Sequence, residues 1–216
     1  MNTKMFCFQC EQTACGKACT GAAGVCGKKA DTAVLQDRLT GALIGLARAS
    51  EGNESLLTET THRLVIEALF ATLTNVSFDN DTISALTRHV EEEKSRLIAD
   101  CGGCASDCGH NEDYDMNRLW SADEDIRSLK SLILFGIRGM AAYAYHAAVL
   151  GYIDKEVNHF LYKALLAVGM DHWGMNELLP IVMETGEVNL KCMDLLDPAN
   201  TQTYRHAAPT PVSLTV

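Results

Sequence analysis

Residues 5–28 read MFCFQCEQTACGKACTGAAGVCGK and place five cysteines within twenty residues: Cys7, Cys10, Cys15, Cys19 and Cys26. Cys7-Phe-Gln-Cys10 is a Cys-x-x-Cys knuckle, a spacing that lets two thiolates reach the same metal centre from one tight turn. Glycines between the cysteines allow backbone amides to come close to a bound ion or to sulfide. The stretch has no apolar period of 2 or 3.6 residues, so we expect a ligand-binding loop rather than a core helix or strand.

Three interpretations of these thiols remain open on spacing alone. Zinc favours two Cys-x-x-Cys-like pairs, and only the first pair has that form here. A disulfide framework suits short secreted chains, and we expect no signal peptide in this one. An iron–sulfur cluster needs four thiolates around one cage and tolerates uneven spacing.

The composition excludes several classes of protein. The chain has 216 residues and a formal charge of −10, with no basic stripe to neutralise phosphates, so we expect no nucleic-acid partner. Its most apolar stretch, residues 129–150, is interrupted by Lys130, Arg138 and His146, which predicts a buried helix rather than a membrane span. Nine cysteines in a chain without a signal peptide favour the reducing cytoplasm, where thiols bind metals or act in catalysis.

Positive charge is concentrated around the cysteine-rich loop, at Lys4, Lys17, Lys28 and Lys29. Four thiolates around iron leave net negative charge, which nearby lysines would partly offset, raising the potential of a cluster. A rim of solvated lysines explains the same pattern equally well.

Apolar periodicity beyond the loop predicts helices only. The expected spans are 31–49, 58–75, about 80–98, 123–150, 154–168 and 176–196. We expect caps at Asp31, at Asn80 or Asp81 and at Asp154, a capping box from Ser121 to Glu124, and an interruption at Gly186. Pro180 is expected in the first turn of its helix.

The fold class predicted from these spans is all-α. A cluster-binding loop (1–30) precedes a first three-helix bundle (31–100), a Cys/Gly-rich connector (101–120), a second bundle (121–200) and an extended tail (201–216). The tail ends in residues 212–216, which alternate like the start of a strand. On residues 123–150, Gly136 and Gly139 suggest close approach to a neighbouring helix, His146 is expected in the core, and Arg127 and Arg138 are expected in ion pairs. Cys192 is expected as a small core residue.

The connector carries a second group of candidate ligands, Cys101, Cys104, Cys108 and His110. These residues could hold zinc or an additional iron–sulfur cluster. They could equally be small buried thiols between glycine turns.

Several motifs together resemble the hybrid-cluster, or prismane, proteins, a family of hydroxylamine reductases. The matching stretches are residues 5–13 (MFCFQCEQT), 24–28 (GVCGK), 31–37 (DTAVLQD), 124–129 (EDIRSL), 139–151 (GMAAYAYHAAVLG) and 195–201 (LLDPANT). They run nearly end to end and are far more specific than a lone Cys-x-x-Cys motif.

The resemblance implies a ligand set for the N-terminal loop. The family pattern falls on Cys7, Cys10, Cys19 and Cys26, and it leaves Cys15 as a free thiol or an alternative ligand. The short interval between Cys10 and Cys19 resembles the members with a [4Fe-4S] cluster, which we favour. The interval between Cys19 and Cys26 resembles the [2Fe-2S] members, so that alternative stays open.

The resemblance also implies a function for the longer protein. In the family, two α/β domains follow the helical domain and carry a hybrid Fe-S-O cluster at which hydroxylamine or nitric oxide is reduced, and those ligands would lie beyond Val216. This chain would then be the electron-entry domain of a hydroxylamine reductase. Its expected partners are the family's α/β domains and an electron donor, either a reductase or a ferredoxin-like protein. The alternative is a self-standing iron–sulfur module for electron transfer or redox sensing.

Overall fold

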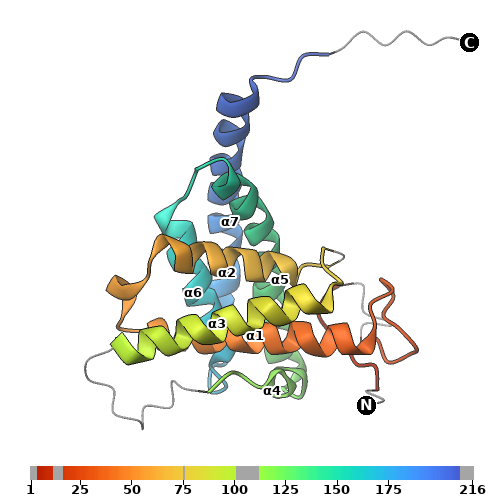
Figure 1. The fold of residues 1–216 in the computed structure, drawn as a ribbon. Coiled ribbons are helices and arrows are strands. Elements are labelled where there is room, and N and C mark those ends of the chain that lie inside the picture. The colour runs from red at the N-terminus through yellow and green to blue at the C-terminus, as the bar shows by residue number, and fades with distance from the viewer. Residues whose placement is uncertain (1–3, 12–16, 75, 101–111, 210–216) are drawn as a thin grey trace, which may run out of the picture.

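The described part of the chain folds mainly into helices. The computed structural model describes residues 4–11, 17–74, 76–100 and 112–209 (Figure 1). Its helices are α1 (Ala30–Ser50), η2 (Glu54–Leu56), α2 (Glu59–Ala71), α3 (Asn80–Asp100), α4 (Met116–Trp120), α5 (Glu124–Val149), α6 (Lys155–Gly169) and α7 (Met175–Tyr204). The described residues form no strand, and the all-α prediction is confirmed.

Several helices begin where a side chain caps the first turn. Thr58 accepts a hydrogen bond from the Thr61 N–H at the start of α2, and Asp154 accepts from Glu156 and Val157 at the start of α6, as predicted. The short helix α4, capped by Asp115, was not predicted. Its five residues are too few for apolar periodicity to register.

Three predicted caps were wrong. Asp31 lies in the first turn of α1, which begins at Ala30. The first turn of α3 is capped by Asp79, whose carboxylate accepts from the Asp81 N–H. The capping box at Ser121 does not form, because its hydroxyl donates to the Asn117 carbonyl and closes α4 instead. At α3 a neighbouring residue takes over the cap, whereas the residues before α1 and α5, Lys29 and Asp123, make no side-chain capping bond.

The last helix is longer than its sequence pattern predicts. α7 continues through Gly186 and ends at Tyr204, so both the interruption at Gly186 and the start of the extended tail at residue 201 were wrong. Pro180 lies beyond the first turn, where it removes an internal hydrogen bond. Packing of α7 along α5 and α6 outweighs these local costs. Residues 205–209 are non-helical, and the predicted strand at 212–216 lies outside the described residues.

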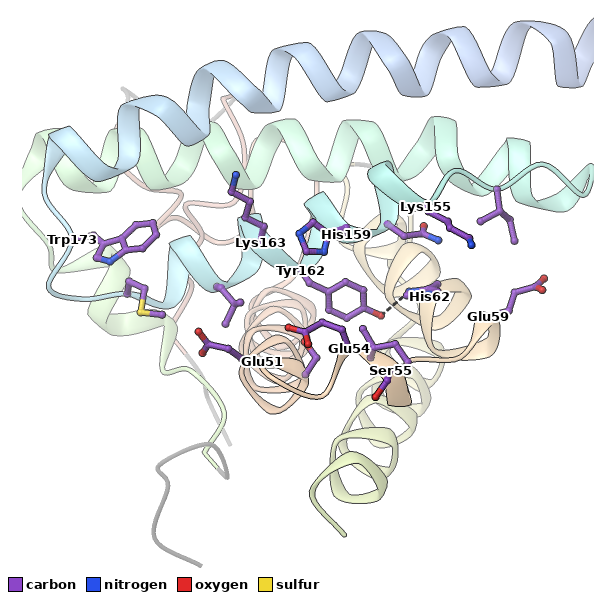
Figure 2. Close-up of a pocket in the computed structure, with 16 residues that line it drawn as sticks. Glu51, Glu54, Ser55, Glu59, His62, Lys155, His159, Tyr162, Lys163 and Trp173 are labelled. Atoms are coloured by element: carbon purple, nitrogen blue, oxygen red, sulfur yellow. Dashed lines mark hydrogen bonds between the residues drawn. The ribbon is translucent and has the colours of Figure 1, made fainter. Parts of the chain in front are cut away.

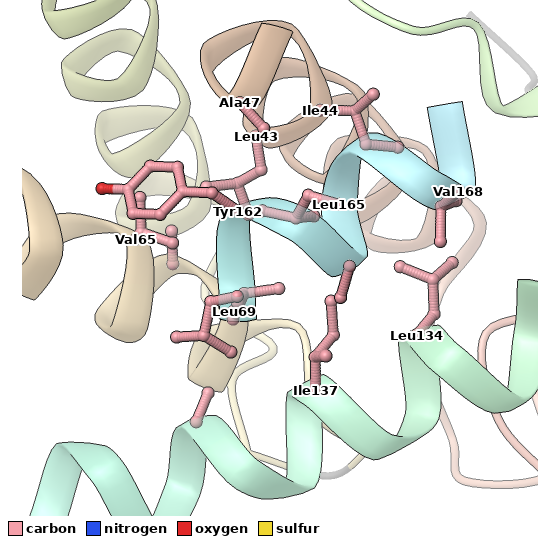
Figure 3. Packing of buried hydrophobic residues seen from close by; sticks show 14 of the residues in the cluster. Leu43, Ile44, Ala47, Val65, Leu69, Leu134, Ile137, Tyr162, Leu165 and Val168 are labelled. Carbon is pink, nitrogen blue, oxygen red and sulfur yellow. The ribbon is translucent and has the colours of Figure 1, made fainter. Parts of the chain in front are cut away.

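The helices share one hydrophobic core. α1 packs on α3 and α5 packs on α7, while α2 packs on α5 and α1 on α6 across the two predicted bundles. Figure 3 shows Leu43 of α1, Leu69 of α2, Ile137 of α5 and Leu165 of α6 meeting in this core. The core therefore runs through both halves of the chain.

α5 is the central helix of this arrangement. By length and composition alone it is the one helix among the described residues that could cross a membrane, a test that core helices also pass. It carries Lys130 and Arg138 as buried side chains and packs on α2, α6 and α7. His146 is exposed and stacks edge-on with Phe70 and Tyr145, so its prediction as a core residue was wrong.

Candidate functional site

Two segments of the cysteine-rich loop pair through their backbones. Cys7 and Cys19 form an antiparallel bridge, in which the Cys7 N–H donates to the Cys19 carbonyl (3.1 Å) and the Cys19 N–H donates to the Cys7 carbonyl (2.9 Å). Both side chains are buried together with Met5 and Ala33, in a small apolar cluster separate from the main core. Residues twelve apart in the sequence are thereby brought to one place.

Cys10 and Cys26 are half-buried near this bridge. The Cys10 thiol lies close enough to interact electrostatically with Cys7. The Cys26 sulfur and the Met5 methyl lie 3.5 and 3.4 Å from where a side chain on Gly24 would begin. A turn closed by hydrogen bonds from Gly24 to Lys28 (2.8 Å) and from Gly27 to Gly24 (2.9 Å) holds Cys26 there. The four described cysteines of the loop, Cys7, Cys10, Cys19 and Cys26, therefore gather at one end of the molecule.

A buried polar network supports the Cys7–Cys10 turn from the interior of the protein. Gln9, which lies between Cys7 and Cys10, accepts a hydrogen bond from Lys28 Nζ on its side-chain oxygen (2.7 Å). Its amide nitrogen donates to Asp37 (2.6 Å), and its backbone carbonyl accepts from Arg138 (2.8 Å). The loop is thus anchored to α1 and α5 through the single residue Gln9.

Among the described residues, Arg138 makes this anchor without a carboxylate at ion-pair distance. It is 1% exposed, and its second terminal nitrogen donates to the Thr40 hydroxyl (3.2 Å). The prediction that Arg138 is ion-paired was therefore wrong in detail, although Asp37 lies near enough to stabilise its charge. Arg127 likewise lies over the Phe8 ring, 5.6 Å from its centroid.

Burial disfavours negative charge on the Cys7 sulfur, and nearby polar groups offset that effect in part. Burial raises the pKa of the Cys7 thiol, while the Lys28 ammonium and the Gln9 backbone N–H oppose that rise. Lys28 is 3% exposed, so one member of the predicted lysine rim is in fact part of the interior, whereas Lys4, Lys17 and Lys29 are exposed. Two buried cations, Lys28 and Arg138, therefore stand behind the thiols.

This donor set fits a polynuclear iron–sulfur cluster. Within the part of the chain that the structure describes, no three His, Cys, Asp or Glu side chains converge on a point that could hold one metal ion. In a cluster each thiolate can bind a different iron, so its ligands stand farther apart than the ligands of a single ion. Four cysteines on one loop, backed by the buried cations Lys28 and Arg138, supply the donor type that a cluster needs, and their role as ligands stays a prediction.

Other predicted ligands are not tested. Cys15 and the second group, Cys101, Cys104, Cys108 and His110, lie outside the described residues. Cys192 is fully buried on α7 and its thiol faces the Met140 carbonyl (3.5 Å), which confirms it as a small core residue.

A second concave feature lies away from the cysteines, between α6 and the segment that leads into α2 (Figure 2). This cavity of about 990 Å³ has basic and imidazole side chains of α6 on one side, among them Lys155 and His159, and Glu51 and Glu54 on the other. At its base, the Tyr162 hydroxyl lies 3.2 Å from His62 Nδ1. The opposed charges of its walls favour no single ligand chemistry.

The comparison with known proteins identifies the class. Residues 5–216 match the Prismane/CO dehydrogenase family, and the chain belongs to that family. Curated relatives named hydroxylamine reductase include those of Methanocella arvoryzae (40% identical over 97% of this chain), Maridesulfovibrio salexigens (39% over 97%) and Porphyromonas gingivalis (37% over 100%). The chain spans 42% of the length of each of these relatives.

The support residues of the site were the part that sequence reasoning missed. Gln9 and Asp37 lie within the matching stretches 5–13 and 31–37, but no role was predicted for them, and their hydrogen bond across the loop and the facing helix shows that role. The role of Arg138 was partly visible in the sequence, because a charged residue within the apolar stretch of α5 needs buried partners.

Proposed function

We propose that this chain is the electron-entry domain of a hydroxylamine reductase, with an iron–sulfur cluster held by Cys7, Cys10, Cys19 and Cys26. The observation that carries the proposal is the pairing of Cys7 with Cys19. It brings Cys7 and Cys10 close to the later Cys19 and Cys26, where two of the side chains are buried and two are half-buried. Membership of the family and the names of the relatives support the oxidoreductase class.

The cluster, when bound, would accept and release single electrons. The chain's own residues would bind it through four thiolates, exclude water on the side of Met5 and Ala33, and place Lys28 and Arg138 against its negative charge. We favour a [4Fe-4S] cluster, with [2Fe-2S] as the alternative.

The reaction itself belongs to the longer protein in this proposal. Hydroxylamine takes up two electrons and two protons, its N–O bond breaks, and ammonia and water leave. We place that step at a hybrid Fe-S-O cluster in α/β domains that lie beyond this chain. A cytoplasmic location and an external electron donor complete the proposal.

The test is an assay of iron, sulfide and zinc on anaerobically purified chain, with visible and electron-spin resonance spectra. One cubane predicts about four iron and four sulfide per chain, and about eight of each would place a further cluster at Cys101–Cys108. The isolated chain should not reduce hydroxylamine with a reduced dye as the electron source. Zinc without sulfide, or turnover comparable to that of full-length relatives, would contradict the proposal.

A further inference from the structure

A shallow hollow of about 550 Å³ opens on the surface directly outside the cysteine bridge. Its lining comes from two segments of the loop, residues 4–6 and 20–22, and from the start of α1: Lys4, Met5, Phe6, Thr20, Gly21, Ala22 and Ala30. Met5 is common to this lining and to the buried cluster that contains Cys7 and Cys19. One layer of side chains therefore separates the hollow from the candidate cluster.

The surface at this place is apolar in the centre and basic around it. Phe6 is 40% exposed and lines the hollow, and Val34 is 48% exposed, one helical turn after Ala30 on α1. Lys4 lines the hollow, and Lys29 is exposed beside Ala30. An apolar centre within a charged rim is the usual anatomy of a protein–protein contact.

The charge of this region is opposite to that of the rest of the chain. Residues 1–34 contain four lysines against Glu11 and Asp31, a net charge of +2, whereas the remaining residues carry −12 of the total of −10. The Asp31 carboxylate is engaged by the Asn80 amide (3.0 Å) and its own helix turn (2.8 Å). Lys28 is buried, so the exposed charges of this region are those of Lys4, Lys17 and Lys29 against Glu11 and Asp31, a small positive excess.

From this pattern we propose that the hollow bounded by Lys4, Phe6 and Ala30, with Lys29 on its rim, docks a small acidic iron–sulfur protein of the ferredoxin type. An acidic partner is repelled by the net negative charge of residues 35–216 and attracted to the lysines around the hollow, which steers the encounter toward the cysteines. Phe6 then supplies the apolar contact that holds the pair together. The proposal rests on the electron-entry function, because it names the partner of that same site.

The probe is an acidic plant-type [2Fe-2S] ferredoxin, and the measurement is its association rate with the iron-loaded chain at low and at high salt. For the double variant K4E/K29E we expect a fall of about tenfold or more at low salt and a weaker dependence on salt. Lys29 precedes the first turn of α1 and its side chain makes no capping bond, so a carboxylate there does not oppose the helix dipole.

The matched control is K155E/R205E, which makes the same change in net charge on α6 and at the end of α7. This control should keep an association rate within about twofold of the parent chain. F6A should leave the association rate nearly unchanged and raise the dissociation constant about tenfold. Equal slowing by both double variants, no effect of F6A, or no binding at low salt would overturn the proposal.

Iron and sulfide are measured on every variant, so that the two hypotheses fail separately. A parent chain that lacks a cluster contradicts the electron-entry function. A chain that contains the cluster but does not bind the ferredoxin contradicts only the docking surface. Sedimentation of the loaded chain alone tests a second copy as the occupant. A dimer that F6A dissociates would also overturn the proposal.

Discussion

Gln9 lies between two cysteines of the Cys-x-x-Cys motif and joins the loop to two helices. Its side chain lies between Lys28 and Asp37, and its carbonyl accepts from Arg138. A buried charge is stable only when partners replace its lost hydration, and here a glutamine and a backbone carbonyl provide that replacement. At the residue scale, the site is defined as much by these partners as by its thiols.

Serine substitutions distinguish ligands from bystanders among the cysteines. We expect Cys19→Ser to reduce bound iron from about four atoms per chain to less than one. A cluster is held by thiolates, and a serine hydroxyl has no sulfur and stays protonated at neutral pH. Cys15→Ser is the matched control, and it should keep the full iron content. Iron and sulfide analysis after anaerobic purification is the measurement. Full iron in Cys19→Ser together with loss in Cys15→Ser would reverse the assignment.

Asp37 gives the molecule a pH-dependent stability. Burial raises its pKa from 3.8 to about 6, although the Gln9 hydrogen bond and the nearby Arg138 charge act in the opposite direction. Below about pH 4 the carboxyl is protonated in both the folded and the unfolded state. Between pH 4 and 6 the unfolded state ionises first, so the stability that Asp37 contributes falls as the pH rises.

Asp37→Asn removes this titration and keeps an oxygen for Gln9. The variant should match the parent chain near pH 4 and exceed its free energy of unfolding by as much as about 3 kcal/mol at pH 7. Urea unfolding of the iron-loaded proteins at pH 4, 5, 6 and 7 measures the difference. Parallel pH profiles for the two proteins would show that Asp37 ionises normally.

At the scale of elements, the contact between α5 and α7 depends on one glycine. A side chain on Gly136 would begin 2.4 Å from the Thr185 methyl, closer than real side chains come. Gly139, one turn away, has nothing within 4 Å of that position, so its predicted role in close helix approach was wrong. Of these two glycines of α5, packing against α7 therefore requires only Gly136 to lack a side chain.

Alanine substitutions separate the two positions. Gly136→Ala should lower the free energy of unfolding by about 1–3 kcal/mol, because the clash with Thr185 forces α5 and α7 apart. Gly139→Ala should raise it by roughly 0.5–1 kcal/mol, because alanine favours the helix and meets no neighbour. Thermal and urea unfolding provide the values. Equal effects of the two substitutions would contradict the packing explanation.

At the scale of the whole molecule, the two helical groups behave as one body. α2 packs on α5 and α1 packs on α6, so that the core runs through both halves of the sequence. A shared core predicts one cooperative unfolding transition, since neither half can bury its apolar face alone. The loop at residues 4–29 is anchored to both halves, through α1 and through Arg138 of α5.

Leu69→Ala tests this coupling, because the Leu69 side chain is fully buried where α2 meets α5. We expect a loss of about 2–5 kcal/mol, with equal decreases in amide hydrogen-exchange protection in α3 and in α7. Leu190→Ala, at a position that is 64% exposed, is the control and should change protection in neither helix. Loss of protection in α3 alone would show two independent units.

The amino-acid sequence by itself determined the helical class, the positions of most helices and the place of the cysteine-rich loop. Apolar residues at helical spacing must be buried, and that requirement is local enough to be read along the chain. The thiol spacing and the motif resemblance pointed to the family, and the match over residues 5–216 confirms it.

Tertiary structure alone decided which residues support the loop and where the helices end. The pairing of Cys7 with Cys19, and of Gln9 with Arg138 at 129 positions' separation, depends on contacts that no local pattern encodes. α7 passes Gly186 and reaches Tyr204 because burial against α5 and α6 contributes more than the helix propensity of single residues costs. His146 faces solvent for the same reason: which face of α5 is covered was decided by its neighbours.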